Sequence, residues 1–271
     1  MTIAAGFRCK DGVVLCSDSQ ISRGDFGNKY ESKLFTLNHL TDCYLVYAGF
    51  TQFVKELVPQ LKEIASKHEG AALLRGISKC YKAFHRRYFT KGPRSEKSFA
   101  DIVFSIRDGK EVSLHVGSGS HCYPEAEYAS TGTGVPVAEP FFSAFYSRWL
   151  SVREVTHLSV YALKYIKGLA AGVGGNSHIV FIPDKSEPPI FPASGWQLTD
   201  EEVGEIEKEY EFLHEQTRKF LLAYPDMEGL DIAKDLQRIA VVLKRQRDKK
   251  SRSAARQRER WEQEEARRGD D

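Results

Sequence analysis

The chain has 271 residues, of which 41% are hydrophobic and 11% aromatic, enough to bury the core of one large domain or of a domain with an appendage. Its formal net charge of +2 gives no sign of a protein that binds polyanions over its whole surface. The sequence holds no apolar run of the ~18 residues that a membrane span requires, and its first residues lack the layout of a secretory signal. We therefore expect a cytoplasmic protein with no membrane partner.

The five cysteines are odd in number and widely spaced, and none forms a Cys-Xaa-Xaa-Cys pair with another. This pattern fits neither a disulfide framework nor a zinc site. We expect reduced and mostly buried thiols, and we expect neither a metal nor a cofactor.

The N-terminal residues predict a β-hairpin. Residues 2–9 and 13–19 read as two strands, and the Lys-Asp-Gly turn signal at residues 10–12 joins them. Residues 24–30 are polar and predict a loop, while residues 33–37 and 43–48 predict two further strands. The first fifty residues therefore indicate an antiparallel meander.

The middle of the chain alternates between blocks of helices and blocks of strands. Helical spacing of apolar residues predicts helices at 50–67 and 71–89, followed by strands at 99–106 and 111–116. Helices are then predicted at 138–149 and 152–170, and a strand at 178–182. This block order favours an α+β fold with antiparallel sheets between layers of helices over alternating βαβ units. We predict a four-layer αββα sandwich with a C-terminal helical extension.

The last third of the sequence changes character. Thr199 and Glu202 have the spacing of a capping box at the start of an amphipathic helix over residues 199–220. A second helical stretch at 231–243 leads into a charged tail at 244–271, helical or disordered, in which Trp261 is the sole aromatic residue. A solvated tail is therefore favoured over one that binds nucleic acid. We divide the chain into a domain at 1–195, a helical extension at 196–243 and the tail.

The candidate catalytic residues begin directly behind Met1. If Met1 is removed, Thr2 carries a hydroxyl nucleophile and a free α-amine that can act as its base. The predicted hairpin returns Asp18 to the side of Thr2. Lys33 opens the next predicted strand and supplies a cation that Asp18 can orient toward the threonine hydroxyl.

The residues around 47–49 complete the predicted site. Gly49 lies between an apolar strand and a predicted helix, where its backbone N–H can stabilise an oxyanion, although glycine is also common at such a junction for conformational reasons. Tyr47 lies two residues earlier and can either line a specificity pocket for substrate or belong to the core.

These residues resemble the proteasome β-subunit and heat-shock-locus V peptidase family of N-terminal-nucleophile hydrolases. The resemblance rests on Thr2, on residues 10–19, on Lys33 and on Tyr-Ala-Gly at residues 47–49. It implies that Thr2 is the nucleophile, Asp18 the group that orients Lys33, and Gly49 the oxyanion residue. It also implies self-association into a homo-oligomeric ring, peptide or unfolded-protein substrates, and an ATPase unfoldase as a candidate partner.

The chain departs from the proteasome pattern at residues 172–177. Proteasome β subunits carry an aspartate and then a Ser-Gly pair after the last core helix, whereas this chain reads Gly-Val-Gly-Gly-Asn-Ser and has no acid there. The hydroxyls of Ser177, Thr131 and Thr133 are candidates to replace the missing support of the α-amine.

The leading hypothesis is a threonine-type endopeptidase that cleaves peptide bonds through an acyl ester on Thr2. A non-catalytic proteasome-like assembly or interaction protein, and an N-terminal-nucleophile amidase acting on a small amide, are the alternatives. Lys33 is expected to face the surface, so that replacing it with Ala removes activity and leaves stability close to intact.

Overall fold

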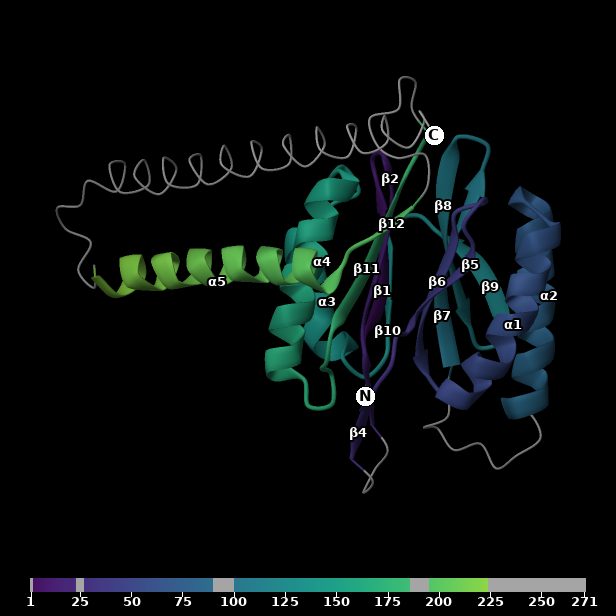
Figure 1. The fold of residues 1–271 in the computed structure, drawn as a ribbon, viewed down its shortest axis with the longest axis horizontal. Coiled ribbons are helices and arrows are strands. Elements are labelled where there is room, and N and C mark those ends of the chain that lie inside the picture. Colours follow the sequence, from purple (N-terminus) through teal and green to yellow (C-terminus); the bar gives the residue numbers. More distant parts are fainter. Residues whose placement is uncertain (1, 23–26, 90–99, 186–194, 224–271) are drawn as a thin grey trace, which may run out of the picture. The chain divides into compact units, whose positions relative to one another are not determined.

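The structure of the chain is a computed structural model that describes residues 2–22, 27–89, 100–185 and 195–223 (Figure 1). The contacts divide the chain into two compact units, Met1–His214 and Glu215–Asp271. The predicted helical stretch at 231–243 and the tail at 244–271 lie outside the described residues. None of the helices in the described part is long and apolar enough to cross a membrane.

The first sheet contains the N-terminal hairpin. Its five strands lie in the order β10-β1-β2-β11-β12, and every neighbouring pair is antiparallel. The strands are β1 (Ala4–Cys9), β2 (Gly12–Asp18), β10 (Tyr128–Thr131), β11 (Ser177–Pro183) and β12 (Trp196–Gln197).

The second sheet follows the chain order β5-β6-β7-β8-β9 and is also antiparallel. Its strands are β5 (Leu34–Asn38), β6 (Cys43–Gly49), β7 (Ala100–Asp108), β8 (Glu111–Ser118) and β9 (His121–Glu125). A separate two-stranded ribbon, β3 (Gln20–Ser22) and β4 (Asn28–Tyr30), projects from the end of the first sheet at which the N-terminus lies (Figure 1).

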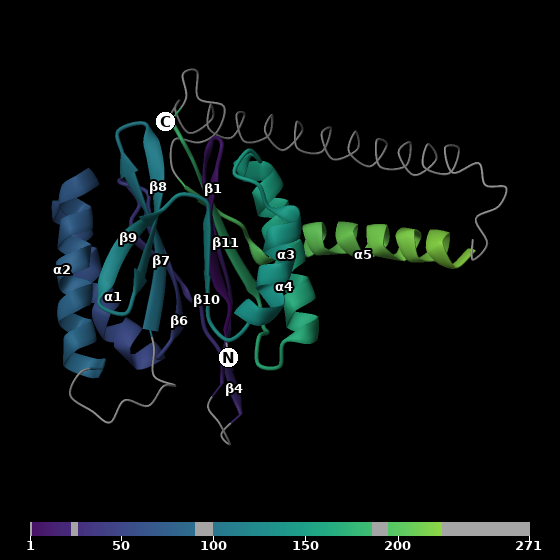
Figure 2. The same cartoon turned by 180° about the vertical axis from the view of Figure 1, so that it is seen from behind.

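Helices cover the outer face of each sheet, as Figures 1 and 2 show from opposite sides. α3 (Val135–Phe145) and α4 (Val152–Leu169) lie against the first sheet, and α1 (Thr51–Lys67) and α2 (Gly70–Phe89) lie against the second. Three buried clusters fill the space between the layers: one under α3 and α4, one between the two sheets, and one under α1 and α2. The predicted α+β four-layer sandwich is confirmed.

Alternation along β1 places its residues in two of these clusters. Ile3, Ala5 and Phe7 point toward α3 and α4, whereas Ala4 points between the sheets. The turn predicted at residues 10–12 closes the hairpin with Cys9 opposite Gly12. Because this register is fixed by burial on both faces, the residues at the open end of the hairpin have fixed neighbours.

Capping residues set where two of the helices begin. The Ser151 and Glu154 side chains form a complete capping box at the start of α4. The box predicted from Thr199 and Glu202 forms at the start of α5 (Asp200–Ala223), with Glu202 N donating to Thr199 Oγ1 at 3.2 Å. Val203 and Ile206 of α5 are buried in the cluster under α3 and α4, and β12 pairs with β11. Residues 196–206 therefore pack with the body rather than apart from it.

Five short strands differ from the sequence-based expectation. β4 lies within residues 24–30, which were expected to form a loop, and β3, β9, β10 and β12 had no predicted counterpart. These strands are short and partly exposed, so they lack the apolar alternation that marks a half-buried strand. α3 begins at Val135 rather than 138 and ends at Phe145 rather than 149.

Candidate active site

The open end of the first hairpin brings Thr2 and Asp18 together. Ala4 lies opposite Ser17 in the antiparallel register, so Ile3 faces Asp18. Asp18 N donates to Ile3 O at 3.2 Å, and Ile3 N donates to Asp18 Oδ1 at 3.1 Å. The predicted proximity of Thr2 and Asp18 therefore follows from the hairpin itself.

The Asp18 carboxylate is fully buried and accepts several hydrogen bonds. Besides Ile3 N, it accepts from Gln20 N at 3.2 Å and from Gly174 N at 3.1 Å, both at Oδ2. Lys33 Nζ lies 2.7 Å from Oδ1. Backbone N–H groups from three segments thus fix the orientation of a carboxylate that holds the lysine.

Lys33 lies directly before β5, with 1% of its surface exposed. Its ammonium donates to Asp18 Oδ1, to the backbone oxygen of Gln20 at 2.5 Å, and to Thr2 Oγ1. Burial lowers the pKa of Lys33 below its ordinary value, and the Asp18 carboxylate opposes that shift. The cation, its carboxylate partner and the threonine hydroxyl therefore form one buried group.

The expectation that Lys33 faces the surface is wrong. A lysine next to a strand is usually solvated, but here its ammonium exchanges water for Asp18, Gln20 O and the Thr2 hydroxyl. Removing one partner of a buried pair leaves the other charge uncompensated. Replacement of Lys33 is consequently expected to lower stability as well as activity.

The turn between β10 and α3 holds the backbone of Thr2, whose residue surface is 8% exposed. Thr2 N donates to Thr133 Oγ1 at 3.1 Å, and Gly134 N donates to Thr2 O at 2.9 Å. Gly132 has a φ of +107°, and a Cβ at this position would lie 2.3 Å from Thr2 O. Only glycine therefore permits this close approach to the threonine carbonyl.

Thr131, Thr133 and Ser177 are the residues whose hydroxyls were expected to support the α-amine of Thr2 in place of an acid. Each of these hydroxyls contacts a different partner. Thr133 reaches the Thr2 nitrogen, as expected of such a replacement. Thr131 donates to Asp101 Oδ2 at 2.9 Å, and Ser177 accepts a hydrogen bond from Lys167. Thr133 is thus the hydroxyl of the three that meets the nitrogen of Thr2.

Gly49 ends β6 with a φ of +106°, ahead of α1. A Cβ added to Gly132 would lie 3.1 Å from the Cβ of Ala48. The turn that holds Thr2 therefore also lies against the residue before Gly49. The backbone of Gly49 therefore lies near the threonine, in the left-handed region that favours glycine.

Tyr47 lies in the core beneath α1 and α2, with 2% of its surface exposed. Its ring stacks on Phe35 at a centroid distance of 5.9 Å, and its hydroxyl lies 3.5 Å from Thr51 Oγ1. This is the core placement that we weighed beside the specificity pocket. The contact of Tyr47 with substrate stays a prediction.

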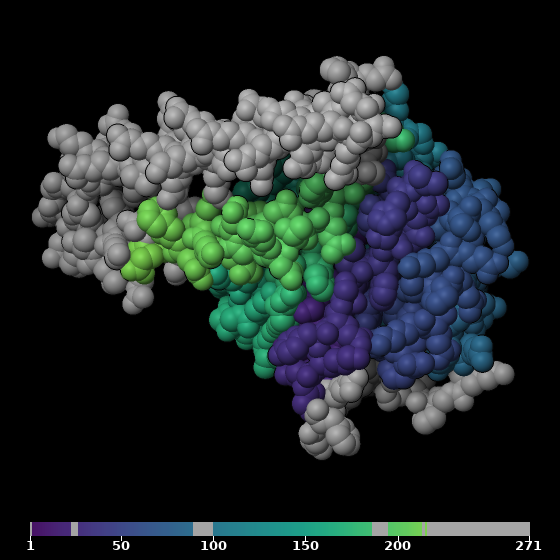
Figure 3. Space-filling view, in the orientation of Figure 1, coloured from purple at the N-terminus to yellow at the C-terminus, as the bar shows by residue number. Residues whose placement is uncertain are grey.

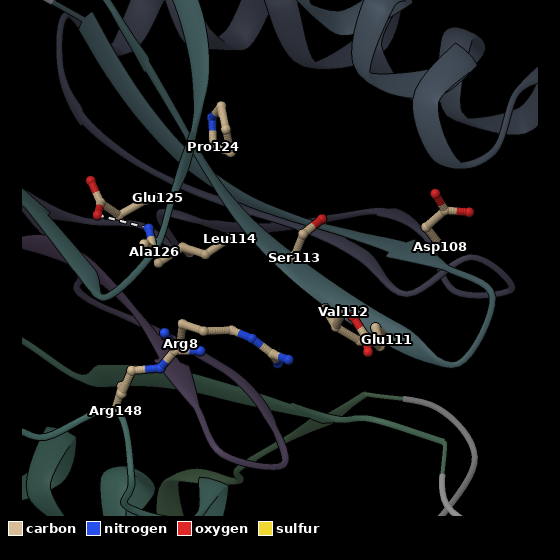
Figure 4. A pocket seen from close by; sticks show the side chains of 10 residues that line it. All are labelled: Arg8, Asp108, Glu111, Val112, Ser113, Leu114, Pro124, Glu125, Ala126 and Arg148. Atoms are coloured by element: carbon tan, nitrogen blue, oxygen red, sulfur yellow. Dashed lines mark hydrogen bonds between the residues drawn. The ribbon is translucent and has the colours of Figure 1, made fainter.

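A pocket of about 400 Å³ lies away from Thr2 (Figure 4). Its lining includes Arg8, which is six positions along β1 from Thr2 and therefore roughly 20 Å away along an extended strand. Arg8 is engaged with Asp184 at 3.1 Å, and Ser113 donates to Ile106 O at 3.0 Å. The pocket is therefore a feature separate from the threonine.

Sequence reasoning missed the backbone groups that contribute to the site, among them Gln20 O and Gly174 N. Neither carries a signal in its side chain, because the backbone makes the contact. Gly174 does stand in the glycine-rich stretch at 172–175, and a Cβ on it would lie 2.2 Å from Gln20 Oε1. The absence of a side chain at Gly174 therefore leaves room for the Gln20 side chain.

The arrangement of Thr2, Asp18 and Lys33 lies within the part of the chain that known proteins share. Proteasome subunit beta 2 of Nitrosopumilus maritimus is 26% identical over 187 residues, covering 66% of this chain and 85% of that protein. Proteasome subunit beta 1 of Ignicoccus hospitalis is 25% identical over 200 residues, covering 70% of this chain and 95% of that protein.

Solved structures agree at the level of the fold. Anbu, described as an ancestral beta-subunit, from Yersinia bercovieri matches with a TM-score of 0.67 at 12% identity, covering 84% of this chain and 100% of that one. A Gly-1 mutant of Anbu from Hyphomicrobium sp. strain MC1 matches with a TM-score of 0.63 at 13% identity, covering 85% and 100%. The proteasome subunit family model itself matches residues 2–182. This range contains the whole second sheet, the first sheet apart from Pro183 and β12, the four helices α1 to α4, and Thr2. The chain therefore belongs to the proteasome subunit family.

Proposed function

We propose that this protein is a threonine-type endopeptidase whose nucleophile is Thr2, exposed as the N-terminal residue by removal of Met1. The observation that carries the proposal is the buried ammonium of Lys33, which contacts the Thr2 hydroxyl while Asp18 and Gln20 O hold it. A fixed cation beside a hydroxyl favours the state in which that oxygen carries negative charge. A threonine placed in a core for packing has no need of such a partner.

Each residue of the site has a separate role in the proposed reaction. Thr2 Oγ1 attacks the carbonyl carbon of the scissile peptide bond, and its proton passes to the free α-amine, whose ordinary pKa of ~7.7–8.0 suits a base at neutral pH. The amine then donates a proton to the departing peptide nitrogen as the C–N bond breaks. Water hydrolyses the resulting ester and restores Thr2.

The charge that develops on the substrate carbonyl oxygen needs a donor. The proposed donor is the backbone N–H of Gly49, at the end of β6 and next to the turn that holds Thr2. Thr133 Oγ1 accepts from the Thr2 nitrogen and so can orient the α-amine toward the hydroxyl. Tyr47 is proposed to contact the substrate side chain.

The names of the relatives extend the proposal to assembly and substrate. Both curated relatives are proteasome beta subunits, and such subunits work as parts of oligomers. We therefore propose that this chain forms a homo-oligomeric ring, acts on peptides or unfolded proteins, and works with an ATPase unfoldase. The expected location is the cytoplasm.

Mass spectrometry tests the proposal directly. The purified full chain is incubated with a threonine-directed electrophile, such as a peptide epoxyketone, and its intact mass and N-terminal sequence are measured. We expect Met1 to be absent, one adduct on Thr2, and no adduct in Thr2→Ala. Retention of Met1, or equal labelling of Thr2→Ala, refutes the mechanism and leaves the non-catalytic alternative.

A second assay separates the peptidase from the amidase. Turnover of an unfolded protein such as casein and of short peptides supports the endopeptidase. Labelling of Thr2 together with hydrolysis of small amides alone favours the amidase.

A further inference from the structure

Behind the site, Lys167 lies in the last turn of α4, where a cation is favoured by the helix dipole. Its ammonium donates to Ser177 Oγ at 2.7 Å. Ser177 opens β11, is 3% exposed, and lies directly opposite Asp18 in the antiparallel register. Lys167 is thus hydrogen-bonded to Ser177, and Ser177 pairs with Asp18, the residue whose carboxylate holds Lys33.

Charges of both signs surround this second lysine. The charged and titratable groups that face it are Asp18 of β2, Glu207 and Asp200 of α5, Lys164 of α4, and His178 of β11. Burial lowers the pKa of Lys167, while the three carboxylates act in the opposite direction. Carboxylates of α5 and of β2 therefore both favour the charged form of Lys167.

A second connection runs from α5 to the same strands. Asn176 Nδ2 donates to Asp200 Oδ2 at 2.9 Å, and Asn176 N donates to Ser19 Oγ at 2.8 Å. Ser19 directly follows Asp18 in the chain. The segment before β11 is consequently bonded to α5 and to the end of β2 at once.

We propose that Lys167 is a positioning residue for the Asp18 and Lys33 pair, and that the first turns of α5 act on the site through Lys167 and through Asn176. The inference rests on the proposed function and extends it, since it assigns a task to a helix that no part of the proposed mechanism uses. Lys167 touches neither the threonine nor the reacting atoms. It fixes the start of β11, where Ser177 and Gly174 support the aspartate.

Loss of Lys167 has two separable consequences. The start of β11 loses its tether, and a small displacement of Asp18 and Lys33 lowers the rate of acylation; displacements of about 1 Å cost up to ~10²-fold. A positive charge is also removed from the surroundings of Asp18, the carboxylate that holds Lys33. Since a like charge disfavours protonation, its removal raises the pKa of Lys33.

The test compares Lys167→Met, Lys167→Arg and Lys164→Met in the full chain, with Met1 removed, using the peptide epoxyketone. We expect Lys167→Met to acylate Thr2 about tenfold more slowly. We also expect the fall of its acylation rate at high pH to occur at a higher pH than in the wild type, because the pKa of Lys33 is raised. Lys167→Arg retains the charge and the hydrogen bond and stays near wild type. Lys164→Met removes a charge one turn earlier, from a lysine that lies 2.5 Å from Glu211, and leaves the rate unchanged.

Asp200→Ala tests the part of the proposal that concerns α5. Loss of its bond to Asn176 is expected to slow acylation about threefold, as loss of about 0.65 kcal/mol of hydrogen bonding implies. A rate equal to that of the wild type refutes the action of α5 on the site.

The outcomes distinguish the two proposals. If wild-type protein is not labelled at Thr2, the proposed function fails and this inference falls with it. If the wild type is labelled and Lys167→Met reacts at the same rate, this inference alone is overturned. A lower melting temperature for Lys167→Met with an unchanged rate and pH profile identifies Lys167 as merely structural and also overturns it.

Discussion

Two buried ion pairs lie at different places in the same sandwich, and their cations differ in the groups to which they donate hydrogen bonds. Lys33 and Asp18 meet at the open end of the first hairpin, while Arg107 and Asp42 meet in the second sheet at 2.6 Å, with side chains 5% and 2% exposed. Within the described residues, Arg107 donates to acceptors that keep the chain in place: Asp42, Lys110 O and Pro183 O. Lys33 instead gives one of its bonds to a hydroxyl.

The difference teaches that burial of a pair is not by itself a sign of catalysis. Asp42 also accepts from Gly195 N at 2.7 Å, so the arginine pair fastens the segment that leads into β12 and α5. An arginine cannot lose its proton in a protein, whereas a buried lysine can. The catalytic candidate is the pair whose cation titrates and whose third contact is a nucleophile.

The largest expected effect comes from breaking the lysine pair. Lys33→Ala is expected to slow acylation of Thr2 by about 10³-fold, because the hydroxyl loses the cation that stabilises its negative charge. It is also expected to lower the free energy of unfolding by about 3 kcal/mol, since Asp18 stays buried without its partner. Labelling kinetics and urea unfolding measure the two effects. Acylation at the wild-type rate contradicts the assignment.

The matched variant Lys33→Arg sharpens the role of titration. In the wild type the rate rises as the α-amine loses its proton near pH ~8 and falls again as pH passes through the Lys33 pKa, which burial places below its ordinary value. Arginine stays charged throughout this range. We expect Lys33→Arg to react more slowly at neutral pH and to lack the decline at high pH. If the rate of Lys33→Arg still falls at high pH as in the wild type, the fall is caused by the titration of a group other than Lys33.

Breaking the arginine pair is expected to affect stability alone. Arg107→Met leaves Asp42 and two backbone carbonyls without their donor, which lowers the free energy of unfolding by about 3–5 kcal/mol. The rate of Thr2 acylation per folded molecule should equal that of the wild type. A slower rate in fully folded protein shows that the two pairs are coupled, contrary to the distinction drawn above.

The smallest expected effect concerns the hydroxyl beside the Thr2 nitrogen. Thr133→Val keeps the shape of the side chain and removes the acceptor of the bond from Thr2 N. Loss of about 1 kcal/mol of orienting interaction slows acylation about fivefold to tenfold. Thr133→Ser keeps the hydroxyl and should retain most of the rate. Equal rates for the valine and serine variants exclude an orienting role.

Local sequence signals were sufficient to predict much of the fold and part of the site. The turn at residues 10–12 and the alternation on either side of it determine that Asp18 returns to Thr2, because a two-stranded register allows no other neighbour. The capping box predicted at Thr199 likewise needs only a spacing of three residues.

The remaining features depend on contacts distant in sequence. The burial of Lys33 follows from acceptors on Asp18 and Gln20, and nothing at position 33 indicates the direction of its side chain. Gly174 N reaches Asp18 from 156 positions away in the chain. The roles of backbone groups and the depth of a charged side chain are products of the assembled sheets, which a one-dimensional pattern does not contain.

The turn after β10 has one further consequence for Thr2. This residue is held at its nitrogen by Thr133 and at its carbonyl oxygen by Gly134, so the same turn anchors both ends of its backbone. The entropy of fixing the threonine is therefore lost during folding and not during the reaction. In the proposed mechanism, removal of Met1 then turns an amide nitrogen into an amine at an atom that Thr133 already contacts.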